Sequence, residues 1–430
     1  MNIKTIIVGS LAIMLAVGGA FYKMTSEGAQ SVYTPRSINN GGLQGQAGYA
    51  EYMHFLKEDP ATGKIDPELV AQVRQEIAAR SKNSNNKTSL GLNWINKGPD
   101  NVGGRTRAIL VDKDNPNIVY AGSIAGGLFV STDGTQNWTQ VAGHQQKNGE
   151  NLAVSCITQT ANGRIFFGTG SGFETKTGNL GGTPGFIGNG VYEYVPSNGQ
   201  VKPVITNTTP VPNNNMGSFW SETNAIAAKG NRLYLGTKDG MVWADPDGNG
   251  DYPTTFSGWT NPIFTNGTIL EKGTCQDIDI AADGSMVVCF SNVVYTSNSD
   301  GVGSFTKHGH FASRNSAAIA PSNNNVIYLL GSSTTLRYLK ISTDKGATWD
   351  IIVPPGSACI DPFVQNDCTG GQGGYDDAIA VDPSDWGRVL VGGVQLYEWK
   401  YNPGSNPIGG SWLKAANLFE SIFNPYYVHA

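Results

Sequence analysis

One strand phrase occurs six times along this chain. Each copy has a short apolar strand, a turn rich in Asp, Asn and Gly, and a second apolar strand, and several copies continue into a third. The copies begin at Ala108, Cys156, Ala225, Asp279, Ala318 and Ala378. A repeat of roughly 40–70 residues made of short strands cannot bury both of its faces alone, so the copies must pack against one another.

This repeat predicts an all-β fold, a β-propeller of antiparallel four-stranded blades. We expect six blades between residues 94 and 419, within a propeller segment of residues 91–430. Residues 424–430 start what reads as another apolar strand, which predicts seven or more blades in the full protein and a C-terminal truncation of this sequence. The 56 glycines among 430 residues agree with many tight turns.

The first 22 residues have the pattern of a targeting segment. Lys4 supplies a positive charge, residues 6–16 are apolar, and residues 18–20 are small. A cleaved signal peptide and an uncleaved N-terminal anchor are both open, since residues 5–22 are just long enough to span a bilayer. Either one predicts use of the secretion machinery and an extracellular, outer-surface or periplasmic location. Residues 23–90 predict a helical pro-segment or linker, with helices near 47–57 and 66–80.

Composition excludes some partners. The formal net charge is −5 and only 15% of residues are charged, so there is no basic footprint for nucleic acid. No basic amphipathic helix marks a membrane surface, so no membrane contact is expected beyond the possible anchor.

Export makes disulfides possible, and the chain has five cysteines. Cys275 and Cys289 flank a turn at nearly matched distances, and Cys359 and Cys368 close a short loop rich in Gly and Pro. Both pairs are predicted as disulfides. The alternative is that every cysteine is an unpaired core residue.

Residues 245–251 have the oxygen spacing of a calcium loop. Asp245, Asp247, Asn249 and Asp251 occupy positions 1, 3, 5 and 7, with Gly250 at position 6. The bidentate Glu of position 12 is absent, because Phe256 stands there. Calcium is thus the single cofactor that the sequence suggests, and an ordinary hairpin turn is the alternative.

An eight-residue motif gives the first family resemblance. Residues 342–349 read Ser-Thr-Asp-Lys-Gly-Ala-Thr-Trp, residues 131–138 are a degenerate copy with Thr135 in the Gly position, and residues 297–301 are a weaker remnant. With the opening at residues 93–109, these motifs resemble the exported BNR/Asp-box propeller proteins of Bacteroidota cell surfaces, in the sialidase-like superfamily, over residues 45–430. The resemblance implies that Asp133 and Asp344 close turns, and that Trp138 and Trp349 pack between sheets.

Two related enzyme groups provide catalytic motifs for comparison. Residues 104–107 read Gly-Arg-Thr-Arg, not the Phe/Tyr-Arg-Ile-Pro of sialidases. Where xyloglucanase-type hydrolases carry a catalytic Asp, this chain has Ile124, and an alkyl group cannot transfer protons. These departures favour a non-catalytic protein over an enzyme.

The remaining candidates precede the six strand phrases, where first strands converge at one rim of a propeller. These positions hold Arg105, Arg107, Ser155, Glu222, Asn224, Gln276, Asp277, Arg314, Asn315, Tyr375, Asp376 and Asp377. The predicted ligand-binding residues are Arg105, Arg107, Glu222, Asn224, Tyr375 and Asp377. Strand alternation predicts that Asp376 points away from Arg105, Arg107, Glu222 and Asp377.

A glycan or a protein is the predicted ligand of this rim. The alternatives are a glycoside hydrolase that uses Glu222, Asp376 and Asp377 as catalytic candidates, and a purely structural surface protein whose rim charges pair with one another.

Overall fold

The computed structural model describes most of the predicted propeller. The described residues are 54–55, 58–59, 62–65, 72–73, 75–76, 105–141, 153–173, 188–206, 222–260, 273–301, 305–352, 362–363, 371–405 and 408–416. The targeting segment, Cys359, Cys368 and residues 424–430 lie outside this part. Of the predicted helical segment, residues 54–55, 72–73 and 75–76 are helical. No helix in the described ranges is both long and apolar enough to cross a membrane.

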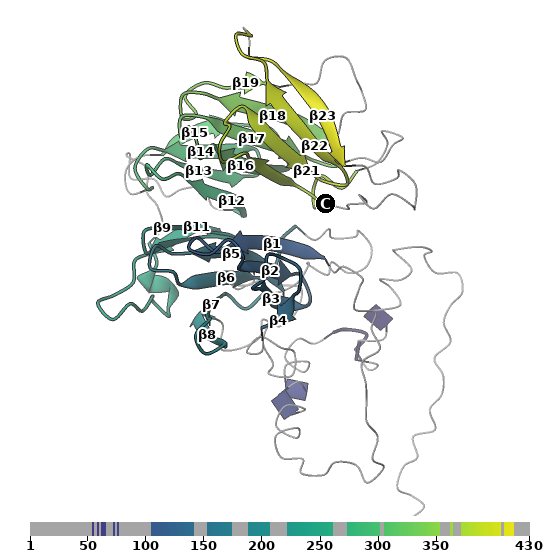
Figure 1. Cartoon of the computed structure of the whole chain (residues 1–430). Helices are drawn as coiled ribbons and strands as arrows, with labels where there is room; N and C mark the ends of the chain where they lie inside the picture. Colours follow the sequence, from purple (N-terminus) through teal and green to yellow (C-terminus); the bar gives the residue numbers. More distant parts are fainter. Residues whose placement is uncertain are drawn as a thin grey trace, which may run out of the picture. The chain divides into compact units, whose positions relative to one another are not determined.

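The described chain forms six antiparallel sheets, each built from strands that follow one another in sequence (Figure 1). Blade 1 contains β1 (Thr106–Val111), β2 (Val119–Ser123), β3 (Gly127–Ser131) and β4 (Thr139–Gln140). Blade 2 contains β5 (Val154–Gln159), β6 (Ile165–Thr169), β7 (Val191–Val195) and β8 (Gln200–Ile205). Blade 3 contains β9 (Thr223–Lys229), β10 (Arg232–Thr237) and β11 (Gly240–Ala244).

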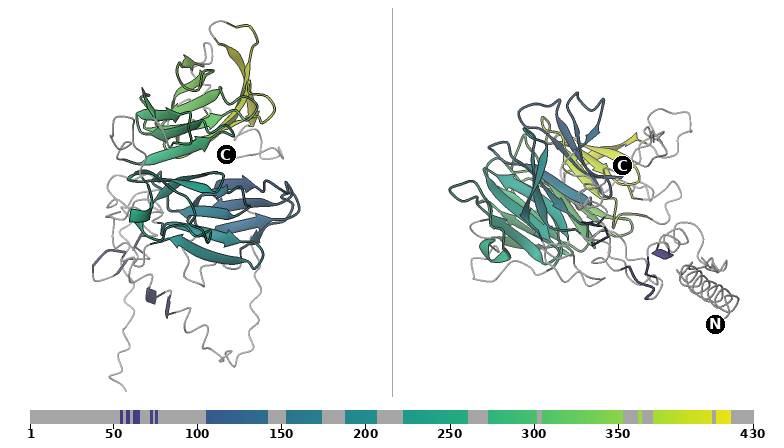
Figure 2. Two further views of the ribbon diagram at one scale, coloured as in Figure 1. Left: turned by 90° about the vertical axis from the view of Figure 1, so that its left-hand side faces the viewer. Right: turned by 90° about the horizontal axis from the view of Figure 1, so that it is seen from below.

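The second half of the described chain repeats this plan, as Figure 2 shows from two further sides. Blade 4 contains β12 (Cys275–Ile280), β13 (Met286–Phe290), β14 (Val293–Ser297) and β15 (Thr306–Gly309). Blade 5 contains β16 (Arg314–Ile319), β17 (Ile327–Ser332), β18 (Leu336–Ser342) and β19 (Asp350–Ile351). Blade 6 contains β20 (Ala378–Val381), β21 (Arg388–Gly392), β22 (Leu396–Tyr401) and β23 (Gly410–Ala416).

The β-propeller with antiparallel blades is therefore confirmed, with one local departure. Blade 3 has three described strands in its sheet, and the fourth position holds an isolated bridge between Trp243 and Thr260. Those two residues exchange both backbone hydrogen bonds, at 2.9 and 2.8 Å. A short 3₁₀ helix, η3 (Phe256–Gly258), precedes Thr260, so these residues do not extend a fourth strand.

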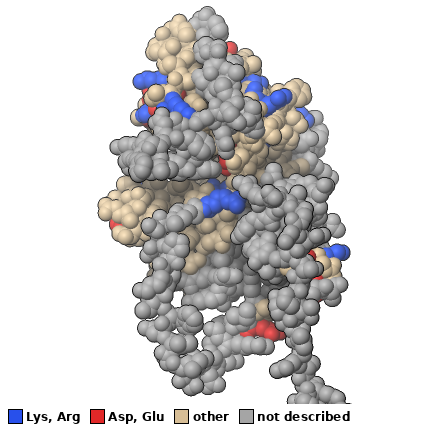
Figure 3. Space-filling view, turned by 90° about the vertical axis from the view of Figure 1, so that its right-hand side faces the viewer, with Lys and Arg blue, Asp and Glu red and all other residues tan. Residues whose placement is uncertain are grey.

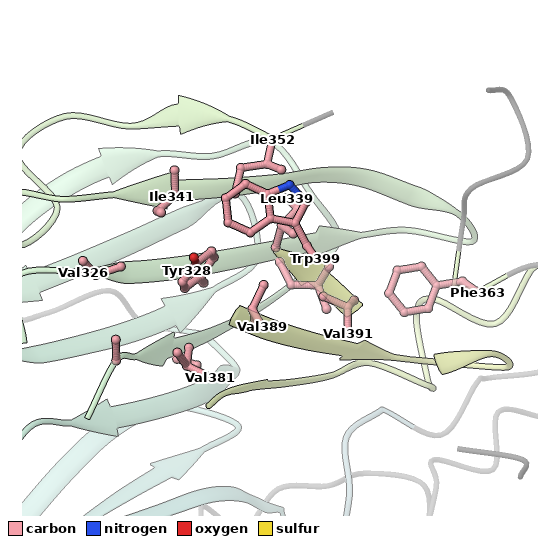
Figure 4. Packing of buried hydrophobic residues seen from close by; sticks show 13 residues of the cluster. Val326, Tyr328, Leu339, Ile341, Ile352, Phe363, Val381, Val389, Val391 and Trp399 are labelled. Atoms are coloured by element: carbon pink, nitrogen blue, oxygen red, sulfur yellow. The ribbon is translucent and has the colours of Figure 1, made fainter. Parts of the chain in front are cut away.

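The hydrophobic core is divided among the interfaces between blades. Five clusters of buried residues each combine side chains of two consecutive blades, from blades 1 and 2 through to blades 5 and 6. In the last of these, Tyr328 and Leu339 of blade 5 pack with Val389 and Trp399 of blade 6 (Figure 4). Alternating side chains on both sheet faces thus bury apolar area on both sides of an inner blade.

The eight-residue motif folds into the turn that its sequence predicts. Asp344 accepts hydrogen bonds from the Ser342 hydroxyl (2.7 Å) and from the Thr348 backbone N–H and hydroxyl (2.8 and 2.6 Å). These donors hold the pKa of Asp344 below its usual value, although partial burial opposes them. Trp349 packs against the core between blades 4 and 5. The motif is therefore a turn-closing device here.

The degenerate copy repeats the turn but not the packing. Asp133 accepts from the Ser131 hydroxyl (2.8 Å) and from the Asn137 N–H (3.0 Å). Trp138, however, is 42% exposed, so the predicted packing of this indole between sheets is wrong. The strand that follows, β4, has only two residues and does not bring the ring onto a neighbouring sheet.

The predicted disulfide between Cys275 and Cys289 does not form. The two residues lie on neighbouring strands, β12 and β13, but both are free buried thiols. Cys275 packs into the core shared with blade 3, and Cys289 packs into the core shared with blade 5. Their side chains point to opposite faces of the sheet, which excludes a bond between the sulfurs.

Candidate functional site

A β-bulge lies near the start of the first strand in each of blades 1 to 4. In each case the pairing with the second strand skips one residue. The skipped residues are Arg107, Ser155, Asn224 and Gln276, which are polar and belong to the rim predicted from sequence. Because a bulge re-aims its side chain, these four residues depart from the simple alternation of a flat strand.

Three of the four bulge residues bind the next blade. Each donates a side-chain hydrogen bond to a backbone carbonyl at the start of the following blade. The pairs are Ser155 with Thr223, Asn224 with Cys275 at 3.3 Å, and Gln276 with Ser313 at 2.8 Å. Asn224 also accepts from the Gly172 N–H at 2.9 Å. This part of the rim therefore holds blades together.

Arg107 departs from that pattern and contacts the segment before blade 6. One Nη of Arg107 donates to the Tyr375 carbonyl at 3.1 Å. Arg105, two residues earlier, donates to the Tyr375 hydroxyl at 2.7 Å, and its guanidinium carbon lies 5.1 Å from the centre of that ring. Arg107 of β1 and Arg105, just before this strand, thus both bind Tyr375, which lies just before blade 6 in the sequence.

A third arginine, from blade 5, reaches the same place. Arg314, the first residue of β16, also donates to the Tyr375 carbonyl and to the Asp377 carbonyl, the latter at 3.2 Å. Arg107 and Arg314 share the ring of Phe173, with guanidinium carbons 4.9 and 4.0 Å from its centre. We call Arg105, Arg107, Phe173, Arg314, Tyr375 and Asp377 the arginine cluster.

The cluster becomes more buried from Arg105 to Arg314. Arg105 is exposed, Arg107 is half-buried, and Arg314 is 7% exposed. Burial lowers the pKa of Arg314 to about 10; Asp377 opposes this shift, whereas Arg107 adds to it. Figure 3 shows basic side chains at several places on one face, one of them near the centre with an acidic side chain directly above it.

Asp377 is the buried acidic member of the arginine cluster. Its side chain is fully buried, and one carboxylate oxygen accepts a hydrogen bond from the Ser332 hydroxyl at 2.6 Å and lies 4.0 Å from the Arg314 Nε. Burial raises the pKa of Asp377, while the Arg314 charge and the Ser332 hydrogen bond counteract it.

Three buried polar atoms of the cluster have no hydrogen-bond partner among the described residues. They are Arg107 Nη2, Arg314 Nε and Asp377 Oδ1. Buried polar groups in native proteins are nearly always paired, with protein, water or ligand. These atoms lie inside the arginine cluster, whereas the exposed Arg105 and the half-buried Arg107 form its accessible side.

The structure places the other predicted site residues as follows. Glu222 is 3% exposed and lies against Gly172, where an added Cβ would come within 2.2 Å of its Oε2. Gly172 precedes Phe173, so Glu222 borders the arginine cluster. Asp376 lies near enough to Arg314 to affect its pKa. Ile124, which the sequence comparison set against the hydrolase acid, is 2% exposed.

In the predicted calcium loop, the carboxylates of Asp245 and Asp247 bind other groups of the protein. Asp245 forms a two-bond ion pair with Arg232, at 2.9 and 2.6 Å. Asp247 accepts from the backbone N–H groups of Asn249 and Asp251, at 2.8 and 2.9 Å. Within the described ranges, no three His, Cys, Asp or Glu side chains are grouped to hold a metal ion. Asp245 and Asp247 thus have partners within the protein, and calcium binding by this loop stays a prediction.

Phe173 is the residue of the cluster that sequence reasoning missed. It lies four residues beyond the end of β6, in a loop with no repeated motif. The sequence carried no signal for it, because its partners Arg107 and Arg314 come from blades 1 and 5.

No family model matches the chain, and no curated protein sequence matches it either. Among solved structures, it is similar to YCF48 from Cyanidioschyzon merolae, at 14% identity over 72% of this chain and 85% of that one, with a TM-score of 0.46. It is also similar to an ancestral GH74 enzyme, at 16% identity over 76% of this chain and 40% of that one, with a TM-score of 0.48.

A GH74 xyloglucanase from Xanthomonas campestris matches at 13% identity, over 73% of this chain and 54% of that one, with a TM-score of 0.38. The chain thus spans less than two thirds of both GH74 enzymes. Its own sheets define the class: this is a β-propeller protein with an arginine-rich cluster where its first strands begin.

Proposed function

We propose that this chain is an exported propeller that binds an acidic glycan at the arginine cluster. The observation that carries the proposal is the meeting of two guanidinium groups, of the exposed Arg105 and the half-buried Arg107, at Tyr375. A sugar carboxylate accepts hydrogen bonds from two such groups. Both guanidinium carbons lie over the Tyr375 ring, 5.1 and 4.9 Å from its centre.

Binding is favoured over hydrolysis for two reasons. Asp377 has a fully buried side chain held by Ser332, so it is poorly placed to protonate a glycosidic oxygen. Ile124 occupies the position of the hydrolase acid. An acidic protein segment would also satisfy the arginines, and the comparison with poly-glutamate below distinguishes it from a glycan.

Export is part of the proposal and rests on residues 1–22. The positive charge, apolar run and small residues of that segment support it. N-terminal sequencing of the protein recovered outside the cytoplasm tests it: a start near residue 21 indicates a cleaved signal, and an intact Met1 in the membrane fraction indicates an anchor.

Calorimetric titration tests the ligand class. We expect an oligogalacturonate to bind, and a neutral oligosaccharide of the same length not to. Arg107→Ala should weaken binding at least tenfold, since it removes a charged donor. Arg232→Ala is the matched control, because Arg232 also combines an aromatic contact, 3.9 Å from the Trp243 ring centre, with an ion pair.

The proposal fails if the neutral glycan binds equally well, or if Arg107→Ala changes stability but not affinity. Stronger binding of poly-glutamate than of oligogalacturonate would assign a protein ligand instead. Release of reducing sugar during the titration would indicate hydrolysis.

A further inference from the structure

Phe311 is the most exposed large apolar side chain among the described residues. It is 80% exposed, whereas its neighbours His310 and Ala312 are each 3% exposed. These three residues lie in the connection from β15 to β16, at the end of the blades where the first strands begin. Trp138 is the other exposed large aromatic residue of the described ranges, and it lies in the turn between β3 and β4 at the opposite end. An exposed aromatic ring is therefore present at the rim that also carries the arginine cluster.

The backbone on both sides of Phe311 is held by hydrogen bonds. The His310 N–H donates to the Asn292 carbonyl at 3.0 Å, and the Asn292 N–H donates to the Ala312 carbonyl at 3.0 Å. The Ala312 N–H also donates to the His310 carbonyl at 3.1 Å. Because this part of the chain is already ordered, a ligand that binds the ring has little backbone entropy to overcome.

A short series of contacts connects this loop with the arginine cluster. Ser313 completes the loop, and its hydroxyl oxygen lies 3.1 Å from that of Ser333. Ser332, which precedes Ser333, donates to the Asp377 carboxylate at 2.6 Å. Arg314 follows Ser313 directly, so its Cα lies within about 10 Å of the Cα that carries the exposed ring. The ring and the arginine cluster are therefore neighbouring parts of one rim.

The surroundings of Phe311 favour a sugar over an apolar protein segment. Ser291 and Asn292 are exposed beside the loop, with the Asn292 amide 3.3 Å from the Ser291 hydroxyl oxygen, and Ser313 is exposed on its other side. The C–H face of a sugar ring packs on an aromatic face, while sugar hydroxyls exchange hydrogen bonds with amide and hydroxyl groups. An apolar protein segment needs a larger continuous apolar patch than one ring.

We propose that Phe311 is a second sugar subsite, where one ring of the acidic glycan stacks while the carboxylate of another sugar binds the arginine cluster. This inference rests on the acidic-glycan function proposed above. It specifies the ligand as an oligosaccharide that extends along the rim from the arginine cluster toward blade 4. A short acidic sugar occupies the cluster alone, so the contribution of Phe311 depends on the length of the ligand.

Calorimetric titration of the full-length protein with digalacturonate and hexagalacturonate tests the subsite. Phe311→Ala should weaken hexagalacturonate binding about tenfold and leave digalacturonate binding unchanged. Its Tm should not change, because the side chain is 80% exposed. Phe311→Tyr keeps the ring and should bind both oligomers as the unaltered protein does. Trp138→Ala is the aromatic control at the opposite end and should leave both affinities unchanged.

The results separate this subsite from the proposed function. Unchanged hexagalacturonate affinity in Phe311→Ala overturns the subsite, and the acidic-glycan function stands if Arg107→Ala still weakens both oligomers. Equal losses for both oligomers in Phe311→Ala also overturn the subsite, because the ring would then act through Arg314. If neither oligomer binds the unaltered protein, the proposed function fails and the subsite fails with it. A larger loss for poly-glutamate than for hexagalacturonate would assign Phe311 to a protein ligand instead.

Discussion

The guanidinium carbon of Arg314 lies 4.0 Å from the centre of the Phe173 ring. Arg314 is 7% exposed, and Arg107 stacks at 4.9 Å on that ring as well. Because burial strengthens the attraction between a cation and a ring face, Phe173 is expected to stabilise two charges that would otherwise repel each other.

Phe173→Leu removes the ring face and keeps an apolar side chain. We expect the free energy of unfolding to fall by about 2 kcal/mol, the size of a desolvated cation–ring contact. Urea denaturation measures the change. Phe173→Tyr keeps the ring and should be close to the unaltered protein; equal stability of the Leu and Tyr variants would show that the ring face contributes nothing.

Arg105 is the exposed end of the arginine cluster, where it donates to the Tyr375 hydroxyl. Arg105→Glu should weaken oligogalacturonate binding by about tenfold at low salt, and by less as salt screens the exposed charge. Titrations at several salt concentrations measure this. Asp133→Lys reverses a charge in a turn of blade 1 and should leave affinity unchanged. A gain of affinity in Asp133→Lys as large as the loss in Arg105→Glu would mean that net charge, not the cluster, governs binding.

Thr135 has a strained backbone. Its φ of 75° is in the left-handed region, which β-branched residues avoid, whereas the equivalent Gly301 and Gly346 have φ of 69° and 90°. Thr135→Gly should raise the free energy of unfolding by about 1 kcal/mol, because the strain exceeds the entropy that glycine costs.

Gly346→Thr is the reciprocal variant and should destabilise strongly, since an added Cβ would come within 2.6 Å of the Thr296 side chain. Thermal melting of both variants gives the comparison. A Thr135→Gly variant that melts below the unaltered protein would contradict the strain.

Asp344→Ala should lower stability without altering ligand binding. The carboxylate accepts three hydrogen bonds within its turn, and their loss should cost about 1 kcal/mol at this largely exposed site. Thr348→Val removes one of the donors and should cost less. Denaturation and titration of the same samples separate the two effects, and weaker binding at unchanged stability would assign Asp344 to a ligand site.

Stability should fall as pH rises through the titration of Asp277. Burial raises its pKa from 3.8 to about 7, although the Ala317 N–H lowers it by donating to the carboxylate at 2.9 Å. The folded chain therefore holds this proton more tightly than the unfolded chain, so its stabilising effect is present below pH 3.8 and lost by about pH 7.

Asp277→Asn should flatten that decline and lower stability, because the two carboxylate oxygens accept from the Ile278 and Ala317 N–H groups and an amide offers one oxygen for both. The slope should not vanish, since burial also raises the pKa of Asp279 and Asp377. Asp283→Asn is the control: hydrogen bonds, including one from Lys345, outweigh burial and lower its pKa to about 2, so it does not titrate in this range. Denaturation from pH 4 to pH 8 measures the slopes, and an unchanged slope in Asp277→Asn would refute the assignment.

The sequence by itself determined the blades and their turns. The alternation of apolar and polar residues along each phrase indicates which side chains are buried. The hydrogen-bond donors to Asp344 lie within four residues of it, so its turn also follows from the local sequence. The residues just before the six phrases also indicated where a polar rim forms.

The tertiary structure decided which rim residues hold blades together and which meet in the arginine cluster. A one-residue bulge re-aims Arg107 toward Tyr375 and aims Asn224 toward Cys275, and local sequence does not encode a bulge. Phe173 enters the site only because blades 1 and 5 bring their arginines onto its ring. Cys275 and Cys289 likewise face different blades, because the register between β12 and β13 arises from packing on both sheet faces.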